Sequence, residues 1–487
     1  MCGNYEKGLY NQLMEVMARL DSVEKKSKMK IQKLDNEIKE LKDENAQLRK
    51  ENQILRDDNA RLKSIINNDS SNTSLPPSSD QNRKPGRPAN TFNGRVKTGR
   101  KAGGQNGHKG TTLSKAEIGE KLRSGKYRHE VRTLGDASGK KHITKYIVDL
   151  KAETIITELR IYAGSDGKIH VPDEYRSDVT YGPNIRALAV SLYSEGVMSN
   201  DRIAAFLNAA SGGGIRLSEG SIYSFCRKFA ENAGESILHL EEELLNQKVV
   251  ATDATGVTVN GKQNYVRNFS VGNTVVYSAM KSKTIKEMEK VAFLKSFTGT
   301  LVHDHETALY HFGTDHAECN VHVIRYLRKN TEDTGNKWSG KMIRLLCRMN
   351  KERKSRINKG DGSFSKEEIS GYEKEYHGLI EEGRIQNKKT KHQYAKQEEN
   401  TLLNRLDKYS HNHLLFLHDF SVFFDDNISE RDLRKVKNRE KMAGGFRKES
   451  GHEMYCKILT IIETLKKRKM DMIENIRKLF MKTPAVF

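Results

Sequence analysis

The sequence has few cysteines and no long hydrophobic segment. Its five cysteines are odd in number and far apart: Cys2, Cys226, Cys319, Cys347 and Cys456. This spacing argues against a disulfide framework, so we expect a reducing compartment, the cytoplasmic interior or nucleoid of a bacterium. No apolar run approaches the roughly 18–20 residues of a membrane span, and the N-terminus is polar. We therefore expect neither a membrane anchor nor a secretory signal.

Acidic residues are too few to balance the basic ones. The 487 residues include 85 Lys and Arg against 64 Asp and Glu, which gives a formal net charge of +21. This excess favours a polyanionic partner, most commonly nucleic acid, although a merely soluble basic protein has the same composition. The length allows about three or four domains of ~100–200 residues each.

Residues 29–66 repeat every seven positions. Leucine recurs at one core position, in Leu34, Leu41, Leu48, Leu55 and Leu62. The complementary core position holds Ile31, Ile38, Asn45, Asn52, Asn59 and Ile66. Leucine at d with Ile or Asn at a is typical of a parallel two-stranded coiled coil, where buried asparagines set the register. The pattern predicts a dimerisation segment over residues 1–68.

The charges beside this core indicate the same pairing. The g positions are acidic (Glu37, Glu44, Glu51 and Asp58), and the following e positions are basic (Lys42, Arg49, Arg56 and Lys63). In a parallel dimer every g–e′ pair is attractive, whereas an antiparallel dimer would bring like charges together. We therefore expect a parallel homodimer rather than a single solvated helix.

No acidic residue occurs between Asp80 and Glu117. This stretch accumulates the basic residues Arg83, Lys84, Arg87, Arg95, Lys97, Arg100, Lys101 and Lys109. Such a composition cannot bury a core, so residues 69–112 are predicted to form a disordered basic arm. The flat, extended segment 84–88 (KPGRP) suits the minor groove of double-stranded DNA. A solubilising linker is the alternative.

Two predicted regions follow the arm. Residues 113–180 are expected to form a small β-rich module, with strands at residues 143–150 and 154–162. Residues 181–247 are expected to be helical, with helices at residues 185–194, 200–209 and 218–230, the last two capped by Asn200 and Ser218. Two short helices with a Gly-containing connection fit a DNA-binding helix-turn-helix, but plain packing fits as well.

Residues 248–330 change to strand periodicity. Asn260-Gly261 and Gly272-Asn273 are hairpin turn signals, so three antiparallel strands are expected, followed by a helix at 285–297 and a strand at 300–303. This order begins a ribonuclease-H-like fold. The Lys/Glu-rich residues 331–412 are predicted to be an α-helical insertion. Residues 413–487 would complete the catalytic core, and the whole chain would be multidomain α+β.

Three acids occupy positions suited to phosphodiester chemistry. Asp253 follows the apolar run of the first strand, Asp304 follows the fourth strand, and Glu430 lies on a late helix beginning near Asn427. Cleavage and strand transfer use two divalent cations about 3.5–4 Å apart, and Mg²⁺ prefers oxygen ligands. The aspartates could instead be ordinary turn residues, and Asn427 with Glu430 fits a capping box. Glu440 and Glu449 are alternative third ligands.

Several segments resemble the transposases of the insertion sequence 66 family, which are of the DDE type. They are "NTSLPPSSD", "GRKAGGQNGHKG", "DATGVTV", "GTLVHDHETALYHF", "CNVHVIRYL", "DDNISERDLRKVKNREKMAGGFRKESG" and "IIET". The resemblance spans nearly the whole length, and the proline/serine and glycine/lysine motifs are the most specific.

The resemblance implies a ribonuclease-H-like nuclease that cuts and joins DNA at the ends of a mobile element. It also implies two Mg²⁺ ions, for which Mn²⁺ is expected to substitute. The partners would be double-stranded DNA, at element ends and target, and accessory proteins of the same element. Cys319, His322 and Arg325 match the family's Cys-x-x-His-x-x-Arg stretch; His322 and Arg325, one turn apart, could contact a DNA phosphate.

One departure concerns zinc. Family members usually carry a cysteine-pair zinc module after the basic arm, but this chain has no cysteine between Cys2 and Cys226. His129, His142 and His170 are too scattered to form a site without sulfur ligands, so we expect no zinc.

The chief alternative function is a non-catalytic, dimeric DNA-binding protein. A bZIP version is disfavoured because the basic segment follows the zipper and is broken by prolines and glycines. A coiled-coil scaffold would leave the meander and its acids unexplained.

Overall fold

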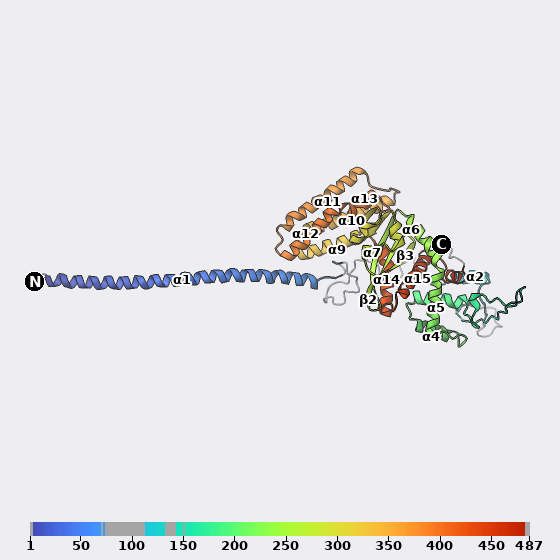
Figure 1. The fold of residues 1–487 in the computed structure, drawn as a ribbon. Helices are drawn as coiled ribbons and strands as arrows, with labels where there is room; N and C mark the ends of the chain where they lie inside the picture. Colours follow the sequence, from blue (N-terminus) through green and yellow to red (C-terminus); the bar gives the residue numbers. More distant parts are fainter. Residues whose placement is uncertain are drawn as a thin grey trace. The chain divides into compact units, whose positions relative to one another are not determined.

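The computed structural model describes residues 3–69, 72–73, 113–131, 143–148, 150 and 152–482 (Figure 1). In these residues the fold is mixed α+β, mostly helical, with one five-stranded mixed sheet. The chain divides into two compact units, one of Met1–Arg87 with Asn320–Phe420 and one of Pro88–Cys319 with Ser421–Phe487. The basic residues predicted for the arm, from Arg83 to Lys109, lie outside the described residues.

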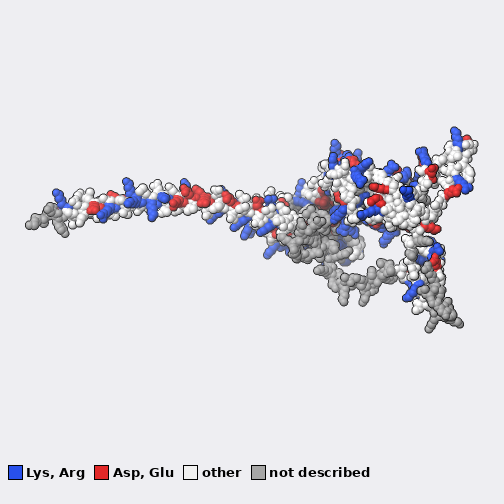
Figure 2. Space-filling view, turned by 90° about the horizontal axis from the view of Figure 1, so that it is seen from below, with Lys and Arg blue, Asp and Glu red and all other residues white. Residues whose placement is uncertain are grey.

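The first unit begins with the long helix α1, Gly3–Ile66, along which acidic and basic side chains are interspersed (Figure 2). The end of α1 packs on helices α9, Asn320–Thr334, and α12, Gln393–Lys408. Lys329 Nζ donates to Ser64 Oγ at 2.6 Å, and Ser64 Oγ donates to a carboxylate oxygen of Asp333 at 3.0 Å. This end of α1 is therefore part of the unit's packing. The coiled coil itself stays a prediction.

A buried carboxylate joins the other helices of this unit, which are α10 (Lys337–Ile357), α11 (Lys366–Asn387) and α13 (Ser410–His418). Glu399 on α12 accepts hydrogen bonds from the side chains of Asn330, Asn336, Trp338, Asn387 and Thr390. Burial raises the pKa of Glu399, but these hydrogen bonds outweigh it and leave the pKa below its usual value. The carboxylate thus compensates for its burial with a full set of donors.

The second unit is built on the five-stranded sheet. Its strands are β1 (Val249–Val259), β2 (Lys262–Val271), β3 (Thr274–Met280), β4 (Thr300–His303) and β5 (Asp315–Glu318), in the order β3-β2-β1-β4-β5. The first three pair antiparallel, whereas β4 and β5 run parallel to β1. The predicted meander is confirmed: Asn260 and Gly261 both have positive φ, at 49° and 72°, as a type I′ turn requires.

The second unit also contains the helices α3 (Pro183–Ser194), α4 (Asn200–Ala210), α5 (Glu219–Asn232), α6 (Gly234–Leu245), α14 (Asn427–Ala443), α15 (Glu449–Lys467) and α16 (Met472–Phe480). Of these, α6, α14 and α15 contact the sheet. Helix α14 contacts β1 and β2, and α15 contacts β3. Ser218 caps α5 as predicted, but α4 is preceded by Ser199 as its N-cap rather than by Asn200. No helix in the described parts is long and apolar enough to cross a membrane.

The predicted strands at 143–150 and 154–162 are wrong: the described residues there form no strand, and the region's regular elements are α2 (Lys115–Arg123) and η2 (Asp173–Tyr175). Ile147 and Ile155 are exposed, and a hairpin without a packed face is only marginally stable. The predicted helix at 285–297 is two short helices, α7 (Ile285–Met288) and α8 (Ala292–Ser296). The five-residue η3 (Thr307–His311) follows β4.

Candidate active site

Asp253 lies on β1, and Asp304 directly follows the neighbouring parallel strand β4. The register pairs Ala251 of β1 with Val302 of β4, and Asp253 and Asp304 each follow this pair by two residues. Adjacent strands are about 4.8 Å apart, and residues in register point to the same face of the sheet. The structure thus brings together the two aspartates that the sequence placed at strand ends.

The electrostatics of Asp253 reflect this neighbour. Burial and the negative charge of Asp304 raise the pKa of Asp253 to about 6. The Ala254 N–H donates to Asp253 Oδ1 at 2.6 Å, and Lys283 and Arg267 carry positive charge nearby, which lowers the pKa in part. The net effect is a carboxyl that is costly to ionise unless another cation approaches.

Helix α14 brings two more carboxyl groups to the same place. Asp426 is its N-cap residue, and Glu430 stands in its first turn, with its N–H donating to the Asp426 carbonyl oxygen at 3.1 Å. Only 1% of the Asp426 surface is exposed. Burial and the charges of Asp253, Asp304 and Glu430 raise the pKa of Asp426 well above its usual range, against a lowering contact with Cys319. Four carboxyl groups therefore share one region.

The capping-box alternative for Glu430 is wrong, and the two alternative third ligands, Glu440 and Glu449, have other partners. Asn427 is the first helical residue rather than the N-cap, so the expected Asn427–Glu430 capping box does not form. Glu440 accepts a hydrogen bond from Thr258 Oγ1 at 3.1 Å, and Glu449 pairs with Lys281 at 2.8 Å. Each of these glutamates thus has a partner elsewhere in the unit, whereas Glu430 lies near the aspartates.

Asn268 connects the strand of Asp253 to the helix of Glu430. It sits opposite Asp253 on β2 and is fully buried. Its Oδ1 accepts the Asp253 N–H at 3.2 Å, and its Nδ2 donates to the Ser429 carbonyl oxygen at 3.0 Å. Nearby, Ser270 Oγ donates to Asp432 on α14 at 2.7 Å. These bonds fix the start of α14 against β1 and β2.

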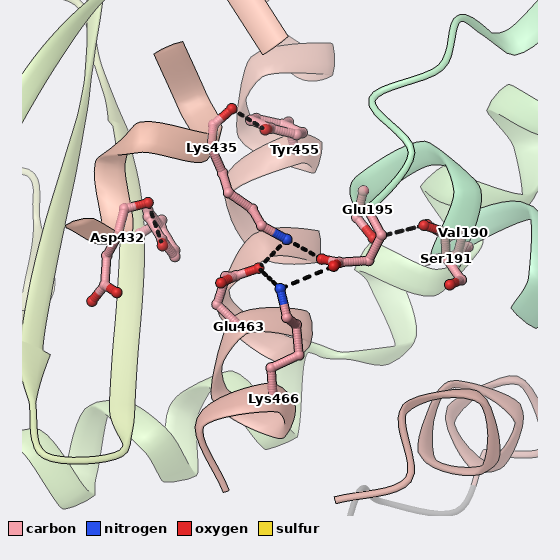
Figure 3. Close-up of polar contacts among 10 residues, drawn as sticks. Val190, Ser191, Glu195, Asp432, Lys435, Tyr455, Glu463 and Lys466 are labelled. Atoms are coloured by element: carbon pink, nitrogen blue, oxygen red, sulfur yellow. Dashed lines mark hydrogen bonds and ion pairs between the residues drawn. The ribbon is translucent and has the colours of Figure 1, made fainter. Parts of the chain in front are cut away.

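The other side of α14 is held by an alternating charge network (Figure 3). Lys435 of α14 pairs with Glu195, which caps α3, and with Glu463 of α15 at 2.7 Å. Lys466 pairs with the same two acids, at 2.9 and 3.4 Å. The Arg439 guanidinium stacks over the Tyr193 ring at 4.1 Å. Helix α14 is therefore fixed on two sides.

A comparison with known families identifies this region of the chain. A model described as the transposase IS66 family matches residues 178–454, more than half of the chain. The chain belongs to the IS66 transposase family. The matched region contains Asp253, Asp304, Asp426 and Glu430. A search of curated proteins found no match.

The donor set agrees with the divalent metal use that membership of this DDE family implies. Buried carboxyl groups of like charge repel one another, and a hard divalent cation would relieve that repulsion through oxygen ligands. The sequence prediction missed Asp426. The available signal was its place one turn before Glu430 in "DDNISER".

Other residues predicted for an IS66-family site lie as follows. His322 on α9 is buried, and its Nε2 lies 3.2 Å from Arg325 Nη1. Their contact with DNA stays a prediction. Cys319 is buried, and its Sγ accepts the Asp426 N–H at 3.4 Å. His170 pairs with Asp166 at 2.7 Å and His129 is exposed, while His142 lies outside the described residues.

Proposed function

We propose that this IS66-family chain is an active DDE transposase that cleaves DNA at the ends of a mobile element and joins it to a target. The single observation that carries the proposal is the nearness of Asp253 on β1, Asp304 directly after β4 and Glu430 on α14. Ordinary turn or capping aspartates would have no reason to converge in a buried region at an electrostatic cost.

The catalytic domain is proposed to be ribonuclease-H-like. Three antiparallel strands followed by two parallel strands, in the order β3-β2-β1-β4-β5, are the arrangement expected of that fold. Residues 331–412 would be its helical insertion. Asp253, Asp304 and Glu430 would hold two Mg²⁺ ions, or Mn²⁺, and Asp426 is a fourth candidate ligand. Such a metal pair activates an attacking oxygen and stabilises the leaving oxygen of a phosphodiester.

The chain's own residues would keep this site in order. Asn268 would hold the first turn of α14 at a fixed distance from Asp253, because it bonds to both. The partners proposed are double-stranded DNA and a second copy of the chain, joined through a parallel coiled coil, with residues 83–109 adding affinity for DNA backbone. Zinc is not among the proposed cofactors.

Amide substitutions test the chemistry. Asp253→Asn, Asp304→Asn or Glu430→Gln should each reduce Mg²⁺-dependent cleavage of element-end DNA to background, because the amide keeps the shape but not the charge that holds a hard cation. Affinity for the same DNA should stay close to that of the unaltered chain. Glu440→Gln, on the same helix, is the control and should retain cleavage. Full DNA binding without cleavage by the unaltered chain would instead favour a regulator.

A further inference from the structure

Helix α10 in the first unit carries a large excess of positive charge. Its basic residues are Lys337, Lys341, Arg344, Arg348, Lys351, Arg353, Lys354 and Arg356, and its one acid is Glu352. The basic side chains of such a helix repel one another unless acids from neighbouring helices, or from a partner, compensate their charge. The two long faces of α10 differ in whether the fold provides such compensation.

The face toward α11 is compensated. Lys341 pairs with Glu382 at 2.7 Å, and Arg348 pairs with Glu375. Arg356 pairs with Glu368 and, at 3.3 Å, with Asp361. These cations have a structural purpose, because they join α10 to α11 and to the loop that precedes it.

The outer, exposed face of α10 is not compensated in this way. Arg344, Lys351 and Lys354 are exposed, and among the residues that the structure describes they form no ion pair. Cys347 lies within one helical turn of Arg344 and Lys351, and it neighbours Arg328 of α9. Burial lowers the pKa of Arg328, and the positive charge of Arg325 adds to that effect against Cys347 and Glu332. Arg325 and Arg328 of α9 are thus near each other, and Arg328 is beside Cys347 of α10.

We propose that this basic outer face of α10, made of Arg344, Lys351 and Lys354, binds the phosphate backbone of double-stranded DNA. From Arg344 to Lys354 the helix rises about 15 Å, enough to follow several phosphates of one strand. Cations without interleaved base-reading groups position a duplex rather than read its sequence. The proposal rests on the proposed function only for the substrate class, DNA, and does not depend on catalysis.

Salt dependence of binding tests this face in the full-length chain. The triple variant R344Q/K351Q/K354Q should bind a non-specific duplex more weakly, and the slope of log Kd against log salt should fall by about 2–3, because each lost phosphate contact removes ~0.9. The control K366Q/K374Q/K389Q makes the same charge change at exposed positions of the same unit and should keep the slope. The charge-preserving R344K/K351R/K354R should also keep it.

The outcomes separate the two proposals. If the triple variant matches its control in affinity and slope while its thermal unfolding is unchanged, the basic face does not bind DNA and the inference is overturned. If the triple variant has a smaller slope of log Kd against log salt but the unaltered chain never cleaves DNA, the basic face binds DNA and the proposed catalytic function is wrong. If the charge-preserving variant also has a smaller salt slope, a folding defect explains the change. That result would also refute the claim that the basic face binds DNA.

Discussion

At the residue scale, the candidate site places like charges where they cost stability. Asp253, Asp304 and Asp426 approach one another in a region that also excludes much of the solvent, and burial with mutual repulsion raises the pKa of both Asp253 and Asp426. A fold selected for stability alone would not retain this arrangement, which is common where a site must bind a cation.

Asp253 gives a pH-dependent prediction. Its pKa rises from 3.8 unfolded to about 6 folded, so the metal-free fold gains stability from protonation below pH 4 and loses it as pH rises through 6. Mg²⁺ needs the ionised carboxylate, so it should raise Tm more at pH 7.5 than at pH 5. At pH 7.5 Asp253→Asn should raise the metal-free Tm and abolish the Mg²⁺ shift. An equal Mg²⁺ shift in this variant, measured by thermal unfolding, would contradict the assignment.

The sequence could predict three of the four acids, but it could not show that Asp426 rather than Asp425 is the fourth. Asp253 and Asp304 follow apolar strand residues, and parallel strands bring their ends together. Asp425 and Asp426 are adjacent in the sequence, and which one is buried depends on how α14 begins. The capping-box interpretation started the helix one residue too late, and a shift of one residue turns a helical side chain by about 100°.

At the element scale, local signals predicted the strands whose neighbours follow directly in the chain. The turns at Asn260-Gly261 and Gly272-Asn273 determine the meander without long-range information. The split between α7 and α8 needed tertiary contacts. On one straight helix Met288 would point away from Phe293 and Phe297, yet all three are buried, and the break before Ala292 allows this.

The hydrogen bonds of Asn268, which hold α14 against the sheet, give a prediction at this scale. Asn268→Ala removes the acceptor for the Asp253 N–H and the donor to Ser429, leaving buried polar groups unpaired at a cost of about 1–3 kcal/mol. We expect the Mg²⁺ concentration for half-maximal cleavage to rise several-fold, with DNA affinity unchanged. Gln263→Ala, exposed on the same strand, is the control. A lower Tm with an unaltered Mg²⁺ requirement would show that Asn268 is structural only.

At the scale of the whole molecule, α1 uses two different faces. Asp57 and Ser64, which bond to α12 and α9, occupy the f position of the heptads; Asp57 accepts the Gln393 N–H at 3.3 Å. The d-position leucines lie on the opposite side and remain 48–68% exposed at Leu34, Leu48, Leu55 and Leu62. Attachment to α9 and α12 therefore leaves the row of apolar d-position leucines available, and the g–e′ charges of a second, parallel copy fit it.

Cross-linking tests this dimer and its direction together. In a parallel pair identical d positions face each other along the whole helix, so Leu34→Cys, close to one end of the heptads, should form a disulfide between two chains on mild oxidation. Asn36→Cys, two residues away at an outward f position, should not. In an antiparallel pair Leu34 would lie opposite residues near the other end, and neither variant would cross-link. Sedimentation of the unaltered chain as a monomer at micromolar concentration would refute dimerisation through α1 in either direction.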